Sequence, residues 1–463
     1  MDARSKALLA FLVSMVIALS NANPPPVEPP GAPLLLTPLL DNGNIDKARA
    51  LSEIDREEFP SLPRSHAGYL TVDKELGNHL FFWYFPSHTN PKAPLLIWLN
   101  GGPAVSSMLG LLWEHGPIEV RTDAQEKVTY GARNHTWVGP FSIVYVDNPV
   151  GTGYSFSDSG AKGFKITQDD YTADLYSFVL QFNKMFPEFK TRGMYIGGQS
   201  YAGKYVPSLG YKIHQSKKTD KACAELKLLG VVLGSPYFDP ETESVAFFDY
   251  LYALGALSHA DKERHKKKVV KMYQSFLDGG QSNATFSELF TDLVLLNELP
   301  LPSLDNYVTG KDANYNAVQK MMTSKEFRKA VHVGNTKYFV SNDALSEMYG
   351  PDVLVSTKAK LAVLMDNYKV LLYNGDYDVV VSSAMIEAAL LTMSWSRQRE
   401  YNDTHRLTWK EKSNLGGFYS QTGQFCRVVI HGAGHQTPHD QPEACFRMVD
   451  AFVHRGCIGS GNA

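Results

Sequence analysis

The sequence has no excess of positive charge, few cysteines and no long hydrophobic segment beyond its first residues. Its 463 residues carry 45 Lys and Arg against 48 Asp and Glu, a formal net charge of -3, so no overall field attracts nucleic acid or an anionic membrane surface. The four cysteines, Cys223, Cys426, Cys445 and Cys457, form no Cys-x-x-Cys pair and have no zinc-type histidine pattern beside them. We therefore expect no nucleic-acid partner, no metal and no cofactor.

An apolar stretch at the start has the form of a targeting signal. Arg4 and Lys6 precede the run from Ala7 to Leu19, and the small residues of Ser20-Asn21-Ala22 suit cleavage. Thirteen apolar residues fall short of the roughly 20 that span a bilayer. Residues 1–22 are therefore predicted to be a cleaved signal peptide rather than a membrane anchor, and the protein to be secreted or lysosomal/endosomal without membrane insertion.

Two further features fit a location outside the cytosol. Asn134, Asn283 and Asn402 each begin an Asn-x-Thr sequon and are predicted glycosylation sites. In an oxidising compartment four cysteines permit one or two disulfides, and three full pairings stay open. The three cysteines near the C-terminus are candidates for local pairing.

Short apolar runs along the chain predict a buried sheet. Aromatic and β-branched residues from His66 to Phe85 indicate a hairpin that turns near Gly77-Asn78. Later runs, each ending in Gly, Asn, Asp or Ser, are typical of strands buried on both faces: 94–99, 141–146, 194–197, 228–233, 369–373 and 427–430. Helical segments such as Thr167 to Phe186 lie between several of them. The pattern predicts an α/β fold, a mostly parallel central sheet with helices on both faces.

The strand-like runs stop after Ser235 and resume after about Asp352. We predict an α/β core with a first part at 23–235, which begins with a proline-rich arm, and a second part at 353–463. The largely helical segment 236–352 is predicted to be a cap inserted over the sheet. No linker or internal repeat indicates a second folding unit.

One strand runs into a serine flanked by small residues. Met194 to Gly197 is followed by Gly198-Gln199-Ser200-Tyr201-Ala202-Gly203 and then by a helical pattern. A strained strand-to-helix turn of this kind, a nucleophile elbow, holds a serine hydroxyl above the sheet of an α/β-hydrolase. Ala202 stands where a glycine is usual, and alone the motif is also compatible with an ordinary turn.

The serine needs a general base and a carboxylate to orient that base, because a free hydroxyl is a poor nucleophile at neutral pH. Asp376 and Asp378 follow one predicted strand, and His431 and His435 follow another, in the hydrolase order Ser, Asp, His. Active groups of open α/β sheets gather at these carboxyl ends of strands.

The pattern favours Asp378 and His435 as the acid and the base. Val379-Val380 follows Asp378, as is common after the acid in this fold, whereas Asp376 sits within the turn, where Asp often caps backbone N–H groups. Three small residues before His435 let a loop bring its ring to the serine, while His431 adjoins the strand. Asp376 and His431 stay open as alternatives.

Several separated motifs together resemble the serine carboxypeptidases, from about Leu34 to Phe452. They are Trp98-Leu99-Asn100-Gly101-Gly102-Pro103, Asp147-Asn148-Pro149-Val150-Gly151-Thr152-Gly153-Tyr154-Ser155, Gly198-Gln199-Ser200-Tyr201-Ala202-Gly203-Lys204-Tyr205-Val206-Pro207, and Gly434-His435 with Pro438 and Asp440. A likeness to the vitellogenic-like carboxypeptidases rests on Leu36-Thr37-Pro38, Glu114-His115-Gly116-Pro117 and His332-Val333-Gly334-Asn335.

The resemblance implies further site residues. The backbone N–H groups of Gly102 and Tyr201 would form the oxyanion hole. The geometry of a nucleophile elbow independently predicts this role for Tyr201, because the N–H after the nucleophile points at the oxyanion. A substrate carboxylate would be held by Asn100, Gly101, Glu114 and Gln199. Without the resemblance, Asn100 and Gly101 are also compatible with a structural turn, and Glu114 is compatible with an exposed position on a helix.

Three positions depart from the family pattern. The residue before the nucleophile is usually Glu and here is Gln199, and Ala104-Val105 replaces a Gly-Cys pair, which removes one disulfide of the family. If position 104 needs positive φ, its alanine costs about 1 kcal/mol or shifts the loop.

The predicted function is a serine-type carboxypeptidase that removes C-terminal residues from peptides and proteins through an acyl-enzyme on Ser200. An acyltransferase on the same scaffold and a non-catalytic secreted binding or storage protein are the alternatives, because a fold alone does not fix a function. A homodimer is kept as a hypothesis.

Overall fold

The computed structural model describes residues 31–125, 127–279, 301–310, 312–411 and 414–459. Within these residues one large sheet has the strand order β1-β2-β6-β3-β8-β9-β10-β13-β12-β11, and β7 pairs with β2. The six central strands from β6 to β13 run parallel, and the pairs at both edges are antiparallel. The strands are β1 His66–Asp73, β2 Asn78–Phe85, β3 Leu95–Leu99, β6 Ser142–Val146, β7 Phe156–Ser157, β8 Met194–Gln199, β9 Leu228–Gly234, β10 Lys369–Gly375, β11 Leu407–Glu411, β12 Asn414–Thr422 and β13 Phe425–Ile430.

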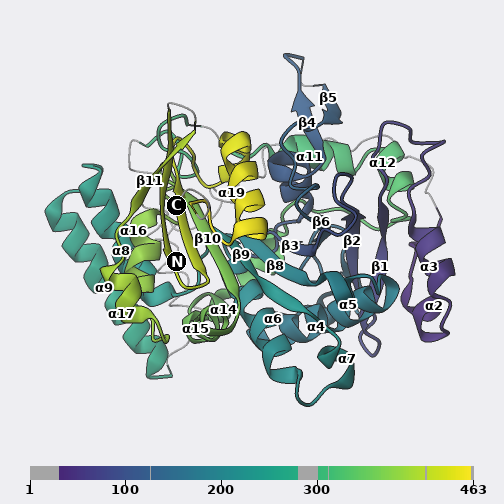
Figure 1. The fold of residues 1–463 in the computed structure, drawn as a ribbon, viewed down its shortest axis with the longest axis horizontal. Coiled ribbons are helices and arrows are strands. Elements are labelled where there is room, and N and C mark those ends of the chain that lie inside the picture. The colour runs from purple at the N-terminus through teal and green to yellow at the C-terminus, as the bar shows by residue number, and fades with distance from the viewer. Residues whose placement is uncertain (1–30, 126, 280–300, 311, 412–413, 460–463) are drawn as a thin grey trace, which may run out of the picture.

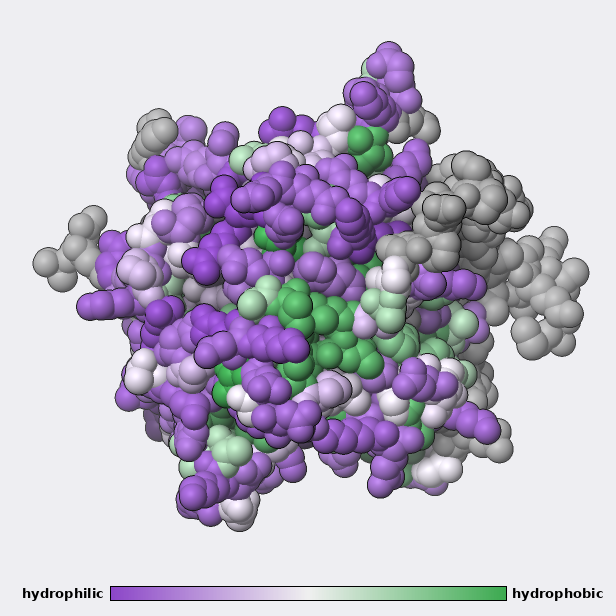
Figure 2. Space-filling model, turned by 90° about the vertical axis from the view of Figure 1, so that its right-hand side faces the viewer, coloured by the Kyte–Doolittle hydropathy of each residue, from purple (hydrophilic) through white to green (hydrophobic). Residues whose placement is uncertain are grey.

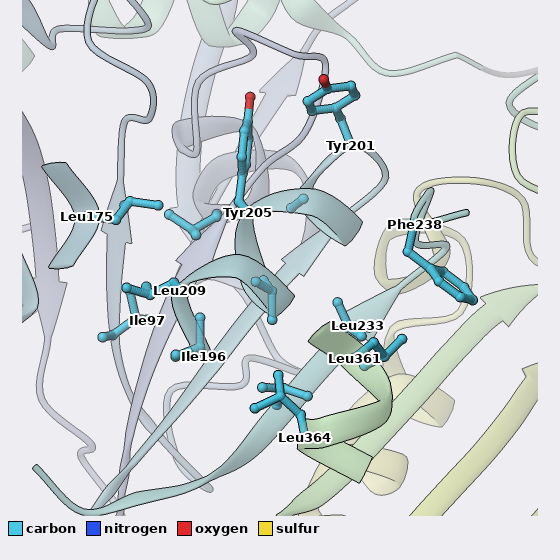
Figure 3. Close-up of a cluster of buried hydrophobic side chains, with 14 of the residues drawn as sticks. Ile97, Leu175, Ile196, Tyr201, Tyr205, Leu209, Leu233, Phe238, Leu361 and Leu364 are labelled. Atoms are coloured by element: carbon cyan, nitrogen blue, oxygen red, sulfur yellow. The ribbon is translucent and has the colours of Figure 1, made fainter. Parts of the chain in front are cut away.

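The central strands are apolar at nearly every position because both faces of the sheet are covered. In β3, Leu95, Ile97 and Leu99 belong to one hydrophobic cluster, while Leu96 and Trp98 belong to another. This alternation follows from the two-residue period of a strand. The two clusters are the two faces, and Figure 3 shows part of the first, with Ile97 and Ile196 of the sheet beside Leu209, Leu361 and Leu364 of the covering helices.

Helices cover both faces (Figure 1). Side chains of six of these helices belong to the first cluster: α2 Thr37–Asp41, α3 Ile45–Ser52, α4 Gln168–Met185, α6 Ala202–Ser216, α15 Lys358–Asn367 and α16 Ser383–Leu391. The second cluster contains side chains of the π-helix η1 Gly110–His115 and of α19 Pro442–Arg455. The short helices η2 Gly160–Gly163, α5 Phe189–Arg192, α7 Lys221–Ala224, α17 Gln398–Asp403 and α18 Thr437–Asp440 lie in connections.

The described part of segment 236–352 contains helices and isolated bridges. The helices are α8 Pro240–Ala253, α9 His259–Leu277, α11 Tyr315–Met322, α12 Lys325–Ala330, α13 Asp343–Met348 and α14 Gly350–Val353. α8 packs on α9 and α16, whereas α11 packs on β4 Ile118–Thr122 and β5 Val128–Ala132, a separate hairpin. Figure 1 accordingly shows α8 and α9 at one end of the molecule and α11 and α12 toward the other.

The α/β prediction with a mostly parallel sheet is confirmed. The hairpin, the six later strands and the helix predicted from Thr167 all occur close to the predicted bounds. The strands β4, β5, β7, β11 and β12 were not predicted from the sequence. The predicted signal peptide and the sequon at Asn283 lie outside the described residues, while Asn134 and Asn402 are exposed.

The C-terminal helix is tied covalently to the sheet. Cys426 of β13 forms a disulfide with Cys457, just beyond α19, whereas Cys223 and Cys445 are buried free thiols. No helix within the described ranges is both long and apolar enough to cross a bilayer. Figure 2 shows one face with mostly polar side chains and an apolar area near its middle.

Candidate active site

Ser200 occupies a strained turn between β8 and α6. Its φ is 61°, a left-handed conformation that costs a non-glycine residue roughly 1–2 kcal/mol. Only small neighbours fit this turn: a Cβ on Gly198 would lie 2.5 Å from the Cβ of Ala202, and one on Gly203 would lie 2.7 Å from backbone atoms of Tyr237. The sequence thus forms the predicted sharp turn, and Ser200 remains partly exposed at the carboxyl edge of the sheet.

Asp378 and His435 form a buried pair at the same edge. His435 Nδ1 lies 2.9 Å from Asp378 Oδ2, and Asp378 Oδ1 accepts the Val381 N–H at 2.9 Å. Burial alone would lower the pKa of His435, but the charge and hydrogen bond of Asp378 outweigh it and raise the pKa to about 9. The carboxylate therefore fixes the ring and stabilises its protonated form.

The two alternative residues form a second pair nearer to solvent. His431 Nδ1 lies 2.6 Å from Asp376 Oδ2, and Asp376 Oδ1 accepts the Gly432 N–H at 2.8 Å. The His431 side chain is 41% exposed, against 7% for His435. Asp376 thus caps a turn, as its position in the sequence indicates.

Gln199 joins the serine turn to the loop that carries His435. Its Nε2 donates a hydrogen bond to the His435 carbonyl oxygen at 3.0 Å, so the nucleophile elbow and the histidine loop are in direct contact. One N–H of the amide is used in this way, and the second stays available as a donor. Its Oε1 is buried with no partner among the described residues.

A short stretch from Ser303 to Tyr307 lies between the two loops that carry Asp378 and His435. The Asp305 carbonyl accepts the His435 N–H at 2.7 Å, and the Leu304 carbonyl accepts the Val379 N–H at 3.0 Å. Asn306 Nδ2 donates to Asp440 Oδ2 at 2.9 Å, and the same oxygen accepts the Gly434 N–H at 2.7 Å. We call residues 303–307 the brace, because it binds both loops.

Sequence reasoning missed the brace. Ser303, Asp305 and Asn306 are polar residues without a local motif, and their partners are far away in the chain; Asn306 and Asp440 are 134 residues apart. Burial raises the pKa of the Asp305 carboxyl to about 6, and this acid in turn favours protonated His435.

The loop after β3 lies against the serine turn. A Cβ on Gly101 would be 2.4 Å from the Tyr201 backbone nitrogen, and Gly102 has φ 106° and precedes a cis proline. The backbone of this loop thus approaches the serine turn so closely that position 101 admits only glycine, and the positive φ favours glycine at position 102. The structure therefore brings Gly101, Gly102 and Tyr201 together.

Tyr201 is also held by its side chain. Its hydroxyl donates to Asp352 Oδ2 at 2.6 Å, and Lys204 Nζ, 5.7 Å from the Tyr201 ring centroid, donates to the Val355 carbonyl at 2.5 Å. Figure 3 shows the rings of Tyr201 and Tyr205 pointing to the same side, away from Ile97 and Ile196. These contacts fix the start of α6 immediately after the serine.

Asn100 and Glu114 meet beneath this loop. Asn100 Nδ2 donates to Glu114 Oε1 at 3.1 Å, and its Oδ1 accepts from Trp98 Nε1 at 2.8 Å. Burial raises the pKa of Glu114 to about 7, although the Asn100 hydrogen bond acts in the opposite direction. Glu114 is fully buried in the π-helix η1 rather than exposed on a helix.

Ala104 has φ 64°. Position 104 therefore has the positive φ that was considered from the sequence, and the loop adopts it although the residue is an alanine. Among the described residues, no group of three or more His, Cys, Asp or Glu side chains is arranged to hold a metal ion.

Comparisons with known proteins identify the family of the chain. A family model described as serine carboxypeptidase matches residues 57–455. The probable serine carboxypeptidase CPVL of Homo sapiens is 37% identical over 450 residues, which cover 93% of this chain and 91% of the relative. The vitellogenic carboxypeptidase of Aedes aegypti is 31% identical over 448 residues, 92% of this chain and 91% of the relative.

A solved structure supports the fold. The structure of KEX1(DELTA)P, a prohormone-processing carboxypeptidase from Saccharomyces cerevisiae, has a TM-score of 0.75 and 20% sequence identity, and the match covers 87% of this chain and 96% of that one. At this identity the likeness concerns the architecture.

Proposed function

The chain belongs to the serine carboxypeptidase family, as its motifs predict, and on this premise we propose that Ser200, His435 and Asp378 are its catalytic residues. It is a serine-type carboxypeptidase, and peptides with a free C-terminus are its substrates. The observation that carries the residue assignment is the buried His435–Asp378 pair, held beside the strained Ser200 turn through Gln199.

In the proposed reaction Ser200 Oγ attacks the carbonyl carbon of the last peptide bond, and His435 Nε2 takes the hydroxyl proton. His435 then gives that proton to the leaving amine, which departs as the free C-terminal residue. Water, deprotonated by the same histidine, hydrolyses the acyl-enzyme and restores Ser200. Asp378 holds the imidazole tautomer throughout and stabilises the imidazolium.

The developing oxyanion would be bound by the N–H groups of Gly102 and Tyr201. The close approach of the 101–102 loop to Tyr201 supports this assignment. Donors placed for the oxyanion are each typically worth about 3 kcal/mol of transition-state stabilisation.

Asn100, Gly101, Glu114 and Gln199 would bind the substrate carboxylate, which restricts the enzyme to chain ends. The Asn100–Glu114 hydrogen bond and the raised pKa of Glu114 support this role, since a protonated Glu114 can donate to a carboxylate. The remaining N–H of Gln199 is a second donor beside His435.

The test combines labelling and product analysis. A fluorophosphonate probe should label Ser200 in the wild type, and mass spectrometry should show stepwise C-terminal trimming of peptides. Ser200→Ala should remove both signals while the protein stays folded, because the hydroxyl supplies chemistry and little packing. Labelling at another serine, or equal turnover by the variant with contaminating peptidases excluded, would refute the assignment.

The finer predictions about location and assembly remain proposals. The Cys426–Cys457 disulfide supports an oxidising compartment and hence removal of residues 1–22 as a signal peptide. N-terminal sequencing of the mature protein tests this cleavage. The homodimer remains a prediction, for which sedimentation equilibrium gives the mass.

A further inference from the structure

A cavity lies at the edge of the sheet opposite the active site. Its volume is about 580 Å³, within the range of small-molecule sites. Several of its lining residues lie where strands of the sheet begin. They are Pro94 before β3, Tyr195 in β8, Leu228 in β9, Lys369 in β10 and Gln424 before β13.

The active-site residues, by contrast, follow the other ends of these strands. β8 has six residues, and at a rise of about 3.3 Å per residue its first and last residues are about 17 Å apart. A ligand in this cavity would therefore touch neither Ser200 nor His435.

The cavity is lined by positive charge. Lys92, Arg192 and Lys369 contribute three cations, and no Asp or Glu is among its lining residues, although the whole chain has a net charge of -3. Within the described chain, none of the three forms a salt bridge; the Arg192 guanidinium lies over the Phe189 ring, 5.7 Å from its centroid. Unpaired cations that converge on a concave surface select anions.

Neutral hydrogen-bonding groups accompany the cations. Asn90, Asn367 and Gln424 present side-chain amides, each with two N–H donors and one oxygen acceptor. Asn90 Oδ1 accepts the Lys92 N–H at 2.9 Å, and Asn367 Nδ2 donates one hydrogen to the Val363 carbonyl at 2.8 Å, so both keep donors free. Such groups suit hydroxyls on a molecule that also carries a charged ester.

We propose that this cavity binds a sulfate or phosphate ester of a polyhydroxylated molecule such as a sugar. Arg192 and Lys369 hold the oxyanion, because both are half-buried in the cavity wall, and Arg offers the planar fork that pairs with two oxygens. Lys92 adds a third charge from the exposed rim, and the amides contact the hydroxyls. The proposal is independent of the catalytic assignment.

The test is isothermal titration of the full mature protein with four probes: a sulfated disaccharide, its unsulfated parent, a hexose 6-phosphate and the free hexose. We expect at least one ester to bind about ten-fold or more tightly than its neutral parent, with affinity falling as salt rises. Binding of the sulfated or the phosphorylated probe identifies the ester. If neither ester exceeds its parent, the proposal is wrong.

Variants locate the site. Arg192→Ala and Lys369→Gln should each weaken ester binding about ten-fold, and Arg192→Lys should weaken it less than Arg192→Ala. Lys47→Gln, an exposed lysine of α3 on another part of the surface, is the charge-matched control and should bind normally. Peptidase kcat/KM should be unchanged in all four variants, which also shows that they are folded. Equal affinities in Arg192→Ala, Lys369→Gln and Lys47→Gln would overturn the proposal.

Discussion

Asp376 and Asp378, two residues apart after β10, each contact a different histidine, so the two carboxylates have different surroundings. Asp378 is fully buried against His435, whereas Asp376 caps the Gly432 turn and meets the half-exposed His431. The sequence could rank the two aspartates only by their neighbours. Burial is what separates them, and it depends on packing from distant segments.

Substitution of each aspartate should have a different effect. Asp378→Asn is expected to lower kcat/KM by about 10⁴-fold, because the amide no longer fixes the correct tautomer of His435. Asp376→Asn should lower it only a few-fold and reduce the free energy of unfolding by about 1 kcal/mol through weaker turn hydrogen bonds. Kinetics on one peptide substrate and urea unfolding measure both quantities. The reverse order of activities would identify Asp376 as the catalytic acid.

Gln199 occupies the position at which the family usually has Glu, and this difference should affect the pH profile. Its amide donates to the His435 carbonyl and can donate to a substrate carboxylate at every working pH. A glutamate could make either contact only while protonated. Gln199→Glu is therefore expected to shift the kcat/KM optimum for free-carboxylate peptides to lower pH.

A blocked ester substrate is the control for this variant, because it does not use the carboxylate site. Once ionised, the glutamate that Gln199→Glu introduces would stabilise protonated His435, so the acidic limb with the ester should stay in place or move to higher pH. Superimposable peptide profiles, or an equal downward shift with the ester, would contradict the role given to Gln199.

At the scale of elements, the brace shows how a segment without regular structure can hold together the two loops that carry the proposed acid and base. It hydrogen-bonds to the residue after Asp378, to the backbone of His435 and, through Asn306, to Asp440. None of these residues is near it in sequence. The brace, which belongs to segment 236–352, therefore connects that segment to both loops.

Asn306→Ala should slow catalysis without removing a catalytic group. Loss of the Asp440 contact loosens Gly434 and His435, and a small misplacement of the base can be expected to cost about ten-fold in kcat. KM for peptide should change less, because the variant leaves the carboxylate site intact. Thr309→Ala, an exposed position after the brace, is the control. Unchanged kcat in Asn306→Ala would show that the backbone contacts alone position His435.

The sequence predicted the parallel strands because burial on both faces makes them continuously apolar. β12 was missed because most of its residues are polar or glycine, with Gly416 and Gly417 inside it, and β11 because four of its five residues are at least partly exposed. The two-residue β7 is too short to leave a pattern. Ser200, Asp378 and His435 were selected from strand ends, whereas the brace and the cation-lined cavity depend on long-range packing that no local pattern records.

At the scale of the whole molecule, several buried acids make stability depend on pH. Burial raises the pKa of several carboxyl groups, Asp305 to about 6, Glu114, Asp147 and Asp174 to about 7, and Glu243 to about 8, and the net effect at His435 is a pKa of about 9. A group with a raised pKa in the folded state stabilises the protein below its unfolded pKa, and this contribution is lost as pH rises through the folded value.

The free energy of unfolding should therefore fall between about pH 6.5 and 8, by on the order of 2–4 kcal/mol. The buried His66, with a pKa lowered to about 4, is neutral throughout this window, and Lys204, with a pKa lowered to about 8, opposes the trend mainly at the upper end of the window and above it. Urea unfolding at several pH values measures the slope. Glu243→Gln should flatten it, while the exposed Glu75→Gln should not; a stability that rises over this range would contradict the prediction.

The order of the strands in the sheet also has a consequence for biosynthesis. Ser200 follows β8 in the first half of the chain, but β10 and β13, which deliver Asp378 and His435, are added to the sheet beside β9 from the far end of the sequence. A chain made from its N-terminus thus carries the proposed nucleophile without its proposed base, and an open edge at β9, until almost all of it has been translated. On the proposed assignment, a prematurely terminated chain would lack the base and would be inert as a peptidase.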